Sequence, residues 1–257
     1  KLGRLWIVSM WQGIYLYDGK DCWPYTKLNQ QISNRIIELH QDDNGNMWIA
    51  SGSSIYRLSD DTLRLMLDTD SLNFTYEPYF YETDSGMYLF DKPGYHQVGA
   101  FFKDDSVINL QPDFVINAFC GNDSLVHFAI KDSILQVSNG DTINLPFKPA
   151  SAVLRLKQIG NELFVSTAEK LQVIDLYDNS LLKEFNISYV FRITGDDDGD
   201  VWLGNHDGLH VIEDNNLVEV KHENTSFSLI SNILMDAEKN LWIAAQNKGL
   251  ELVCDVD

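Results

Sequence analysis

The sequence contains few cysteines. Cys22, Cys120 and Cys254 are far apart and odd in number among 257 residues. They lack the close spacing of a zinc site, so we predict no metal site, and they do not decide between an oxidising and a reducing compartment. No Gly-rich phosphate loop, nucleophile elbow or His-Glu-x-x-His motif is present either. We therefore predict no cofactor.

Long apolar runs and low-complexity tracts are also missing. No stretch approaches the roughly 20 apolar residues that span a bilayer, and residues 1–10 do not resemble a signal peptide. The chain has only 6 Pro and 16 Gly, while 44% of its residues are hydrophobic, which is enough for a sizeable core. We expect a globular region that does not insert into a membrane and that is a piece of a longer protein.

Basic residues are scarce. Asp and Glu number 38 against 19 Lys and Arg, which gives a formal net charge of −19. Such a chain repels a phosphate backbone, which argues against a nucleic-acid partner. The acidic residues fall in turns along the chain, so a solvated surface explains them better than calcium binding, which stays as an alternative. A full EF-hand loop starting at Asp42 is excluded, because Ser53 occupies the twelfth position, where a bidentate Glu is required.

No segment shows a sustained 3.6-residue apolar period, so we predict almost no helix. Instead, short apolar runs recur around one large side chain in steps of 42, 40, 38, 38, 38 and 40 residues. Repeats three to five lack Trp, and their boundaries between residues 70 and 160 are defined only to within several residues. The seven anchors of the repeats are Trp6, Trp48, Tyr88, Val126, Phe164, Trp202 and Trp242.

Each complete repeat contains four short runs bounded by Asp, Asn and Gly, which is typical of β-strands. A four-stranded unit that recurs near every 40 residues is typical of a propeller blade, because one such sheet cannot bury both of its faces alone. We therefore predict an all-β fold: residues 1–257 form a single seven-bladed β-propeller of four-stranded antiparallel blades. Each anchor side chain is expected to lie between adjacent blades.

The end repeats are incomplete. The sequence begins at the anchor strand of repeat one and ends after the third strand of repeat seven, so we count 26 strands where a full ring would use 28. The missing outer strand and the next inner strand would be contiguous in a repeating chain. We expect flanking sequence of the natural protein to supply them, because an open inner edge is a template for unwanted pairing. Coverage of that edge by another segment is the alternative.

The strong repeats share a consensus. In repeat two its residues are Asn34, Ile36, Leu39, Asp42, Gly45, Asn46, Met47, Trp48 and Ile49. The strand that follows the anchor strand reads Gly13-Ile14-Tyr15-Leu16-Tyr17-Asp18 in repeat one. This consensus resembles the two-component regulator propeller repeat. Repeats one, two, six and seven match it well, whereas repeats three to five match mainly by spacing.

The resemblance implies a periplasmic sensor region of a hybrid two-component system histidine kinase of the kind common in Bacteroidetes. In such inner-membrane receptors, two propellers are followed by an immunoglobulin-like domain, a membrane helix and the kinase. The resemblance further implies homodimeric receptors and oligosaccharide signals released from complex glycans. The partners expected for this region are therefore the remaining receptor domains and a glycan-derived oligosaccharide.

Propellers bind ligands on the face formed by the loops that join the anchor strand to the third strand and the outer strand to the next inner strand. Aromatic side chains there can cover the apolar side of a pyranose, while amides and carboxylates bind its hydroxyl groups. The predicted ligand-binding residues are Trp11, Gln12, Tyr95, His96, Asn205, His206, Gln246 and Asn247. Trp11 lies off the anchor position, and packing on a neighbouring loop or partner domain is its alternative role.

The sequence supports an enzymatic function less well than it supports ligand binding. His206 precedes Asp207, but sequence neighbours rarely face each other in a loop. The Asp-x-Gly-x-x-Trp pattern at residues 43–48 and 197–202 overlaps the Asp-box of sialidases and marks a hairpin turn, in which Gly takes a positive φ. A sialidase also needs three converging arginines and a Tyr nucleophile, and the chain has six arginines in all, several of them within predicted strands.

Three functions follow from these observations. Our first hypothesis is a glycan-sensing propeller without catalytic residues. The alternative is a glycan-active lyase or hydrolase, which converging carboxylates or a His and Tyr pair about 5–10 Å apart would favour, whereas a site of amides and aromatics favours sensing. The third is a scaffold that docks another protein.

Overall fold

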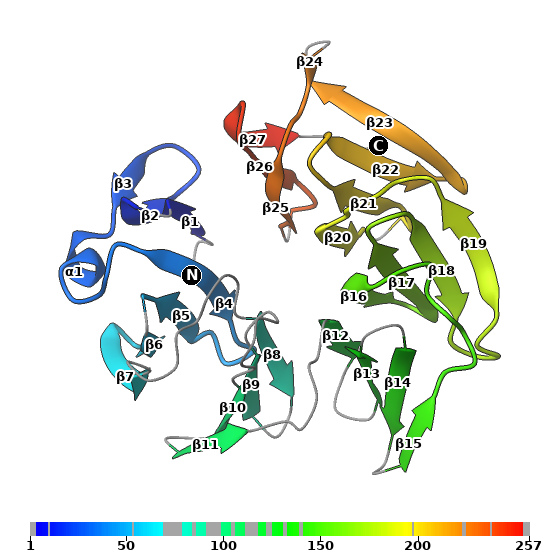
Figure 1. Ribbon diagram of the computed structural model, residues 1–257. Coiled ribbons are helices and arrows are strands. Elements are labelled where there is room, and N and C mark those ends of the chain that lie inside the picture. The colour runs from blue at the N-terminus through cyan, green and yellow to red at the C-terminus, as the bar shows by residue number, and fades with distance from the viewer. Residues whose placement is uncertain are drawn as a thin grey trace. The chain divides into compact units, whose positions relative to one another are not determined.

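The computed structural model describes residues 4–9, 11–52, 54–68, 79–83, 86–90, 99–103, 106–110, 118–121, 125–130, 133–138, 141–196, 198–222, 225–236 and 238–253. The chain divides into two compact units, residues 1–115 and 116–257. Within the described residues, three antiparallel sheets belong to the first unit and four to the second (Figure 1). The predicted fold class is confirmed: this is a seven-bladed β-propeller whose two end blades have three strands.

Within each sheet of the first unit, consecutive strands pair with each other. Sheet one contains β1 (Leu5–Ser9), β2 (Gly13–Tyr17) and β3 (Cys22–Pro24), and the short helix α1 (Thr26–Asn29) follows it. Sheet two contains β4 (Ile36–Gln41), β5 (Met47–Ser51), β6 (Ser54–Ser59) and β7 (Thr62–Asp68). Sheet three contains β8 (Tyr79–Thr83), β9 (Gly86–Phe90), β10 (Gly99–Lys103) and β11 (Ser106–Leu110).

The second unit repeats this plan. Sheet four contains β12 (Ala118–Gly121), β13 (Leu125–Ile130), β14 (Ser133–Ser138) and β15 (Asp141–Asn144). Sheet five contains β16 (Val153–Ile159), β17 (Glu162–Thr167), β18 (Leu171–Asp175) and β19 (Leu181–Phe185). Sheet six contains β20 (Arg192–Gly195), β21 (Val201–Gly204), β22 (Leu209–Glu213), β23 (Asn216–His222) and the short β24 (Thr225–Ser226). Sheet seven contains β25 (Ile230–Met235), β26 (Leu241–Ala245) and β27 (Gly249–Val253).

Apolar clusters fill the space between adjacent sheets of each unit. Successive side chains of a strand point to opposite faces, so in β5 Met47 packs with sheet one while Trp48 packs with sheet three. Trp6, Phe164 and Trp202 likewise pack into clusters that include the next sheet. The predicted wedge role is confirmed for these four anchors.

Repeat four differs from the predicted register by one residue. Ala129 of β13 and Cys120 of β12 belong to the cluster shared with sheet five, and Cys120 pairs with His127. Because side chains alternate along a strand, the structure places His127, and not Val126, in the wedge position. The segment Leu125–Ile130 has apolar residues on both faces and no Trp, so its pattern alone does not select the face.

A repeated hydrogen bond explains why Trp and Asp occur together in the strong repeats. The Trp48 Nε1 atom donates to Asp42 Oδ2 at 2.9 Å. Trp202 donates to Asp196, and Trp242 to Asp236, each at 2.8 Å. The other oxygen of each Asp accepts the backbone N–H four residues later, which closes the hairpin turn. Each Asp therefore joins its turn to the anchor side chain.

Candidate functional site

Four of the eight predicted ligand-binding residues lie in two neighbouring loops of the second unit. Asn205 and His206 follow β21, and Gln246 and Asn247 follow β26. All four therefore lie at the end of the strands where the predicted ligand loops occur. Tyr95 and His96 lie outside the described residues.

The buried Asn205 shapes the loop. Its side chain is 2% exposed, and its Nδ2 donates to the Ser188 carbonyl at 3.1 Å. Its Oδ1 accepts the backbone N–H groups of Asp207 and Gly208, each at 2.9 Å. With these bonds Asn205 holds the segment before β20 against the loop after β21, which is a positioning role.

A similar contact occurs one sheet later. The Oδ1 of the exposed Asn247 accepts the Ser228 backbone N–H at 3.0 Å. The exposed Gln246 donates its own backbone N–H to the carbonyls of Ser228 and Leu229 at 3.2 and 3.3 Å. The loop after β26 therefore holds the segment before β25, and the Gln246 side chain stays at the surface.

Tyr189 and Leu229 occupy equivalent places in these two segments, and sequence reasoning did not select them. Each lies seven residues before the turn Asp of its sheet, Asp196 or Asp236. Tyr189 donates its backbone N–H to the carbonyl of Thr167, the last residue of β17, at 3.1 Å. Leu229 donates its backbone N–H to the carbonyl of His206, in the loop after β21, at 2.9 Å. Their side chains are 46% and 39% exposed, which is high for residues of their size.

Both residues adopt a strained backbone conformation. The φ angles are 53° for Tyr189 and 48° for Leu229. The other described non-glycine residues with positive φ are Asp, Asn or Lys in turns. Large side chains rarely adopt this region, which costs on the order of 1–3 kcal/mol, and such strain clusters at functional sites.

The exposed rings of Tyr189 and His206 lie with Phe191 in one group, here called the aromatic platform. The Tyr189 and His206 rings are parallel to within 2°, with centroids 6.4 Å apart. The Phe191 centroid is 5.0 Å from that of His206 and 6.3 Å from that of Tyr189. Leu229 adjoins the platform through its bond to the His206 carbonyl.

The aromatic platform combines flat apolar surface with polar atoms. Such a surface can cover the apolar face of a pyranose, while the His206 nitrogens, the Tyr189 hydroxyl and the Gln246 amide can bind hydroxyl groups. The same pair of side chains, a Tyr and a His within 10 Å, is also the arrangement that would favour a lyase. The geometry therefore supports ligand binding first and leaves one enzymatic candidate.

The predicted residues of the first unit form no comparable group. Trp11 lies in the turn between β1 and β2 with its side chain 68% exposed. The neighbouring Gln12 accepts a hydrogen bond from the Tyr15 hydroxyl at 3.3 Å. A ligand-binding role for Trp11 and Gln12 stays a prediction.

The described residues also bear on metal binding and membrane insertion. No group of three or more His, Cys, Asp or Glu side chains there is placed to hold a metal ion. Cys22 is exposed and Cys120 buried, both as free thiols, whereas Cys254 lies outside the described residues. No helix in the described part of the chain has the length and apolar character needed to cross a bilayer.

Comparison with known families identifies the repeat. Residues 30–53, which contain the turn Asp42 and the anchor Trp48, match the family model described as two component regulator propeller. Repeat two is a regulator propeller repeat. The resemblance predicted from the sequence is thus confirmed at repeat two. No curated protein matches the chain.

Solved structures are similar to this chain over its whole fold. The extracellular domain of the hybrid two component system BT4673 from B. thetaiotaomicron matches with a TM-score of 0.75 and 17% identity, over 98% of this chain and 37% of that one. PorZ from Porphyromonas gingivalis matches with a TM-score of 0.71 and 11% identity, over 97% of this chain and 35% of that one. This chain therefore spans little more than a third of the length of both.

A propeller enzyme is also similar. Virginiamycin B lyase from Staphylococcus aureus matches with a TM-score of 0.67 and 15% identity, over 98% of both chains. At such identities these likenesses establish the propeller fold and do not transfer an activity or a ligand.

Proposed function

We propose that this chain is an extracytoplasmic sensor propeller of a hybrid two-component receptor and that it binds glycan-derived oligosaccharides on the aromatic platform. The single observation that carries the ligand proposal is the exposed pair of parallel rings formed by Tyr189, in the strained segment before β20, and His206, in the loop after β21. The regulator propeller repeat and the likeness to the BT4673 extracellular domain support the receptor context.

The proposal has consequences for partners and location. The region lies in the periplasm, where released oligosaccharides are present, and works with the remaining domains of a homodimeric receptor. Ligand shifts an existing equilibrium between two receptor arrangements by its difference in affinity for them. With a formal net charge of −19, nucleic acid is not a partner.

Titration calorimetry of the complete extracellular region against a panel of oligosaccharides tests ligand binding. We expect one glycan class to bind, and we expect Tyr189→Ala and His206→Ala each to weaken that binding by about tenfold, because a buried aromatic contact is worth roughly 1 kcal/mol or more. Tyr177→Ala is the matched control, since Tyr177 belongs to the same unit and is 91% exposed. Unchanged affinity in both platform variants would exclude the platform as the site.

A lyase is the second candidate, because Tyr189 and His206 form the pair that such chemistry uses. The His206 imidazole would take the proton next to a uronate carboxyl group, and the Tyr189 hydroxyl would protonate the departing glycosidic oxygen as the C–O bond breaks and a C=C bond forms. Incubation with uronate-containing polysaccharides separates the two functions. Release of unsaturated products that Tyr189→Phe abolishes would replace sensing, whereas binding without turnover supports it.

A further inference from the structure

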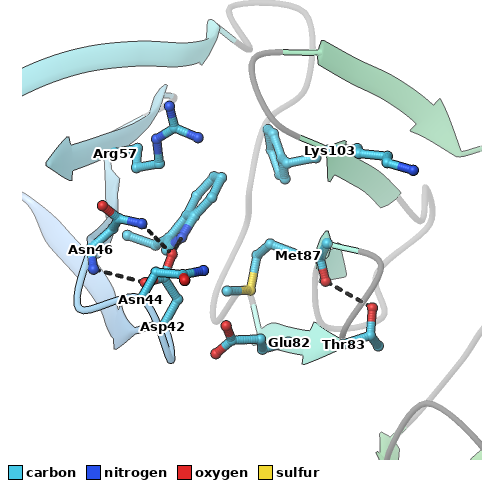
Figure 2. A pocket seen from close by; sticks show the side chains of 11 residues that line it. Asp42, Asn44, Asn46, Arg57, Glu82, Thr83, Met87 and Lys103 are labelled. Carbon is cyan, nitrogen blue, oxygen red and sulfur yellow. Dashed lines mark hydrogen bonds between the residues drawn. The ribbon is translucent and has the colours of Figure 1, made fainter.

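The first unit contains a cavity of about 230 Å³ between sheets two and three, which is a competing place for a ligand (Figure 2). It lies beside the turn between β4 and β5, at the other end of these strands from the predicted ligand loops. The carboxylates in its lining, Asp42 and Glu82, already accept hydrogen bonds from donors of the chain itself. Figure 2 shows Arg57 and Lys103 on opposite sides of the cavity, so these two cations do not converge on one ligand.

In the second unit, the arrangement of the aromatic platform recurs one sheet later. Tyr189 lies seven residues before the turn Asp of sheet six, and His206 lies four residues after the anchor Trp202. The residues at the same two positions of sheet seven are Leu229 and Gln246. Sheet seven therefore has an aliphatic side chain and an amide where sheet six has two rings.

Backbone hydrogen bonds join these two pairs of residues. Leu229 donates its N–H to the His206 carbonyl at 2.9 Å. Gln246 donates its N–H to the Leu229 carbonyl at 3.3 Å. The contacts therefore run in the order Tyr189, His206, Leu229 and Gln246. The pair in sheet seven continues the surface of the aromatic platform.

Both side chains of the pair in sheet seven are available to a ligand. The Leu229 side chain is 39% exposed, and the exposed Gln246 side chain forms no hydrogen bond with the described residues. An amide offers a donor and an acceptor to hydroxyl groups, while an aliphatic side chain covers apolar C–H surface. This combination suits a sugar ring, as the platform does.

Sheet five does not extend this surface. The residue four positions after its anchor Phe164 is Ala168, which has neither a ring nor a polar side-chain group. Toward sheet five, the surface therefore ends at the aromatic platform.

We propose that Leu229 and Gln246 form a second sugar-binding subsite next to the aromatic platform. The ligand is then an oligosaccharide of at least two linked sugars, with one ring on Tyr189 and His206 and the next ring on Leu229. This inference rests on the proposed function, because the first sugar has to occupy the platform. It gives Leu229 a role in selecting ligand length, which accounts for a bulky residue where the backbone is strained.

Titration calorimetry of the complete extracellular region tests the second subsite with pairs of sugars that differ only in length. The pairs are glucose and cellobiose, xylose and xylobiose, mannose and mannobiose, and galacturonate and digalacturonate. Displacement titrations measure the weaker member of each pair. We expect the disaccharide of at least one pair to bind about tenfold more tightly than its monosaccharide, because it also buries the Leu229 side chain.

Variants of Leu229 locate this gain in affinity. Leu229→Ala is expected to reduce the gain to about twofold and to leave the Kd of the monosaccharide unchanged, because the platform keeps both of its rings. Leu229→Met is expected to retain the gain, since it keeps an apolar side chain of similar size. Leu182→Ala is the matched control, because Leu182 is 43% exposed in the same unit but lies in β19.

The possible outcomes separate this inference from the proposed function. Equal affinity for both members of every pair that binds, or an unchanged gain in Leu229→Ala, would overturn the second subsite and leave the platform proposal in place. Loss of monosaccharide binding in Leu229→Ala would also overturn it, because Leu229 would then support the platform instead of contacting a second sugar. Absence of binding for every sugar, or weaker binding in Lys103→Met that places the ligand in the cavity of Figure 2, would contradict both proposals.

Discussion

Tyr189 and Leu229, which lie next to the predicted ligand loops of the second unit, adopt a backbone conformation that Tyr and Leu residues rarely adopt. At an ordinary exposed position, Ala is more stable than Gly by about 0.5–1 kcal/mol. At a positive φ this order reverses, because a Cβ atom costs roughly 1–2 kcal/mol there. The φ of Leu229, 48°, places it in this second class.

We therefore expect Leu229→Gly to be more stable than Leu229→Ala by about 1 kcal/mol in urea unfolding. The reason is relief of strain and not a gained contact, since neither variant keeps the Leu side chain. The control is the same pair of substitutions at Leu182, an exposed residue without positive φ. An Ala variant more stable than the Gly variant at position 229 would show that the strain is absent.

The indole of Trp48 gives a second prediction for a single residue. Trp48→Phe keeps most of the ring packing but removes a donor from the buried Asp42 carboxylate, 9% exposed. We expect a loss of about 1–3 kcal/mol in the free energy of unfolding, the usual cost of a buried charged acceptor losing its partner. The control is Trp6→Phe, because no described residue accepts a hydrogen bond from the Trp6 indole. An equal loss of unfolding free energy in the two variants would contradict the role given to Asp42.

Sheet four carries a histidine where other sheets carry an aromatic wedge. His127 is 0% exposed, its Nδ1 has no hydrogen-bond partner among the described residues, and its Nε2 lies 3.4 Å from Gln136 Oε1. Burial lowers the pKa of His127, and the bond to Gln136 only partly opposes this. Burial also lowers the pKa of His210 in sheet six.

The lowered pKa values of His127 and His210 predict that the second unit loses stability in acid. A histidine whose folded pKa is lowered binds fewer protons when folded than when unfolded, so its stability contribution is complete above the ordinary pKa of about 6.5 and declines as pH falls below that value. We expect His127→Phe to reduce this decline while leaving the part due to His210. Urea unfolding between pH 5 and 8 measures it, with the exposed His206→Ala as control. An unaltered pH profile in His127→Phe would mean that His127 does not titrate between the two states.

For the whole molecule, the sequence was sufficient to predict seven sheets because four repeats keep the anchor Trp. Three of these, repeats two, six and seven, also keep the turn Asp six residues before it. The middle repeats have lost both, so spacing located sheet four but could not separate Val126 from His127. The short β24 was also not predicted, since its two residues carry no strand pattern.

The candidate site was only partly predictable. Loop position selected His206 and Gln246, and it also selected Asn205, whose burial gives it a positioning role instead. Tyr189 and Leu229 were missed because they lie between strands, and residue type does not reveal a positive φ in a bulky residue. Counting seven residues back from each turn Asp would have found both.

A crystal structure of the complete extracellular region with its bound oligosaccharide tests the central claim most directly. We predict one sugar ring against Tyr189 and His206, with its hydroxyl groups near Gln246 and with the glycan intact. A glycan bound away from the loops after β21 and β26, or one cleaved in the crystal, would contradict the account.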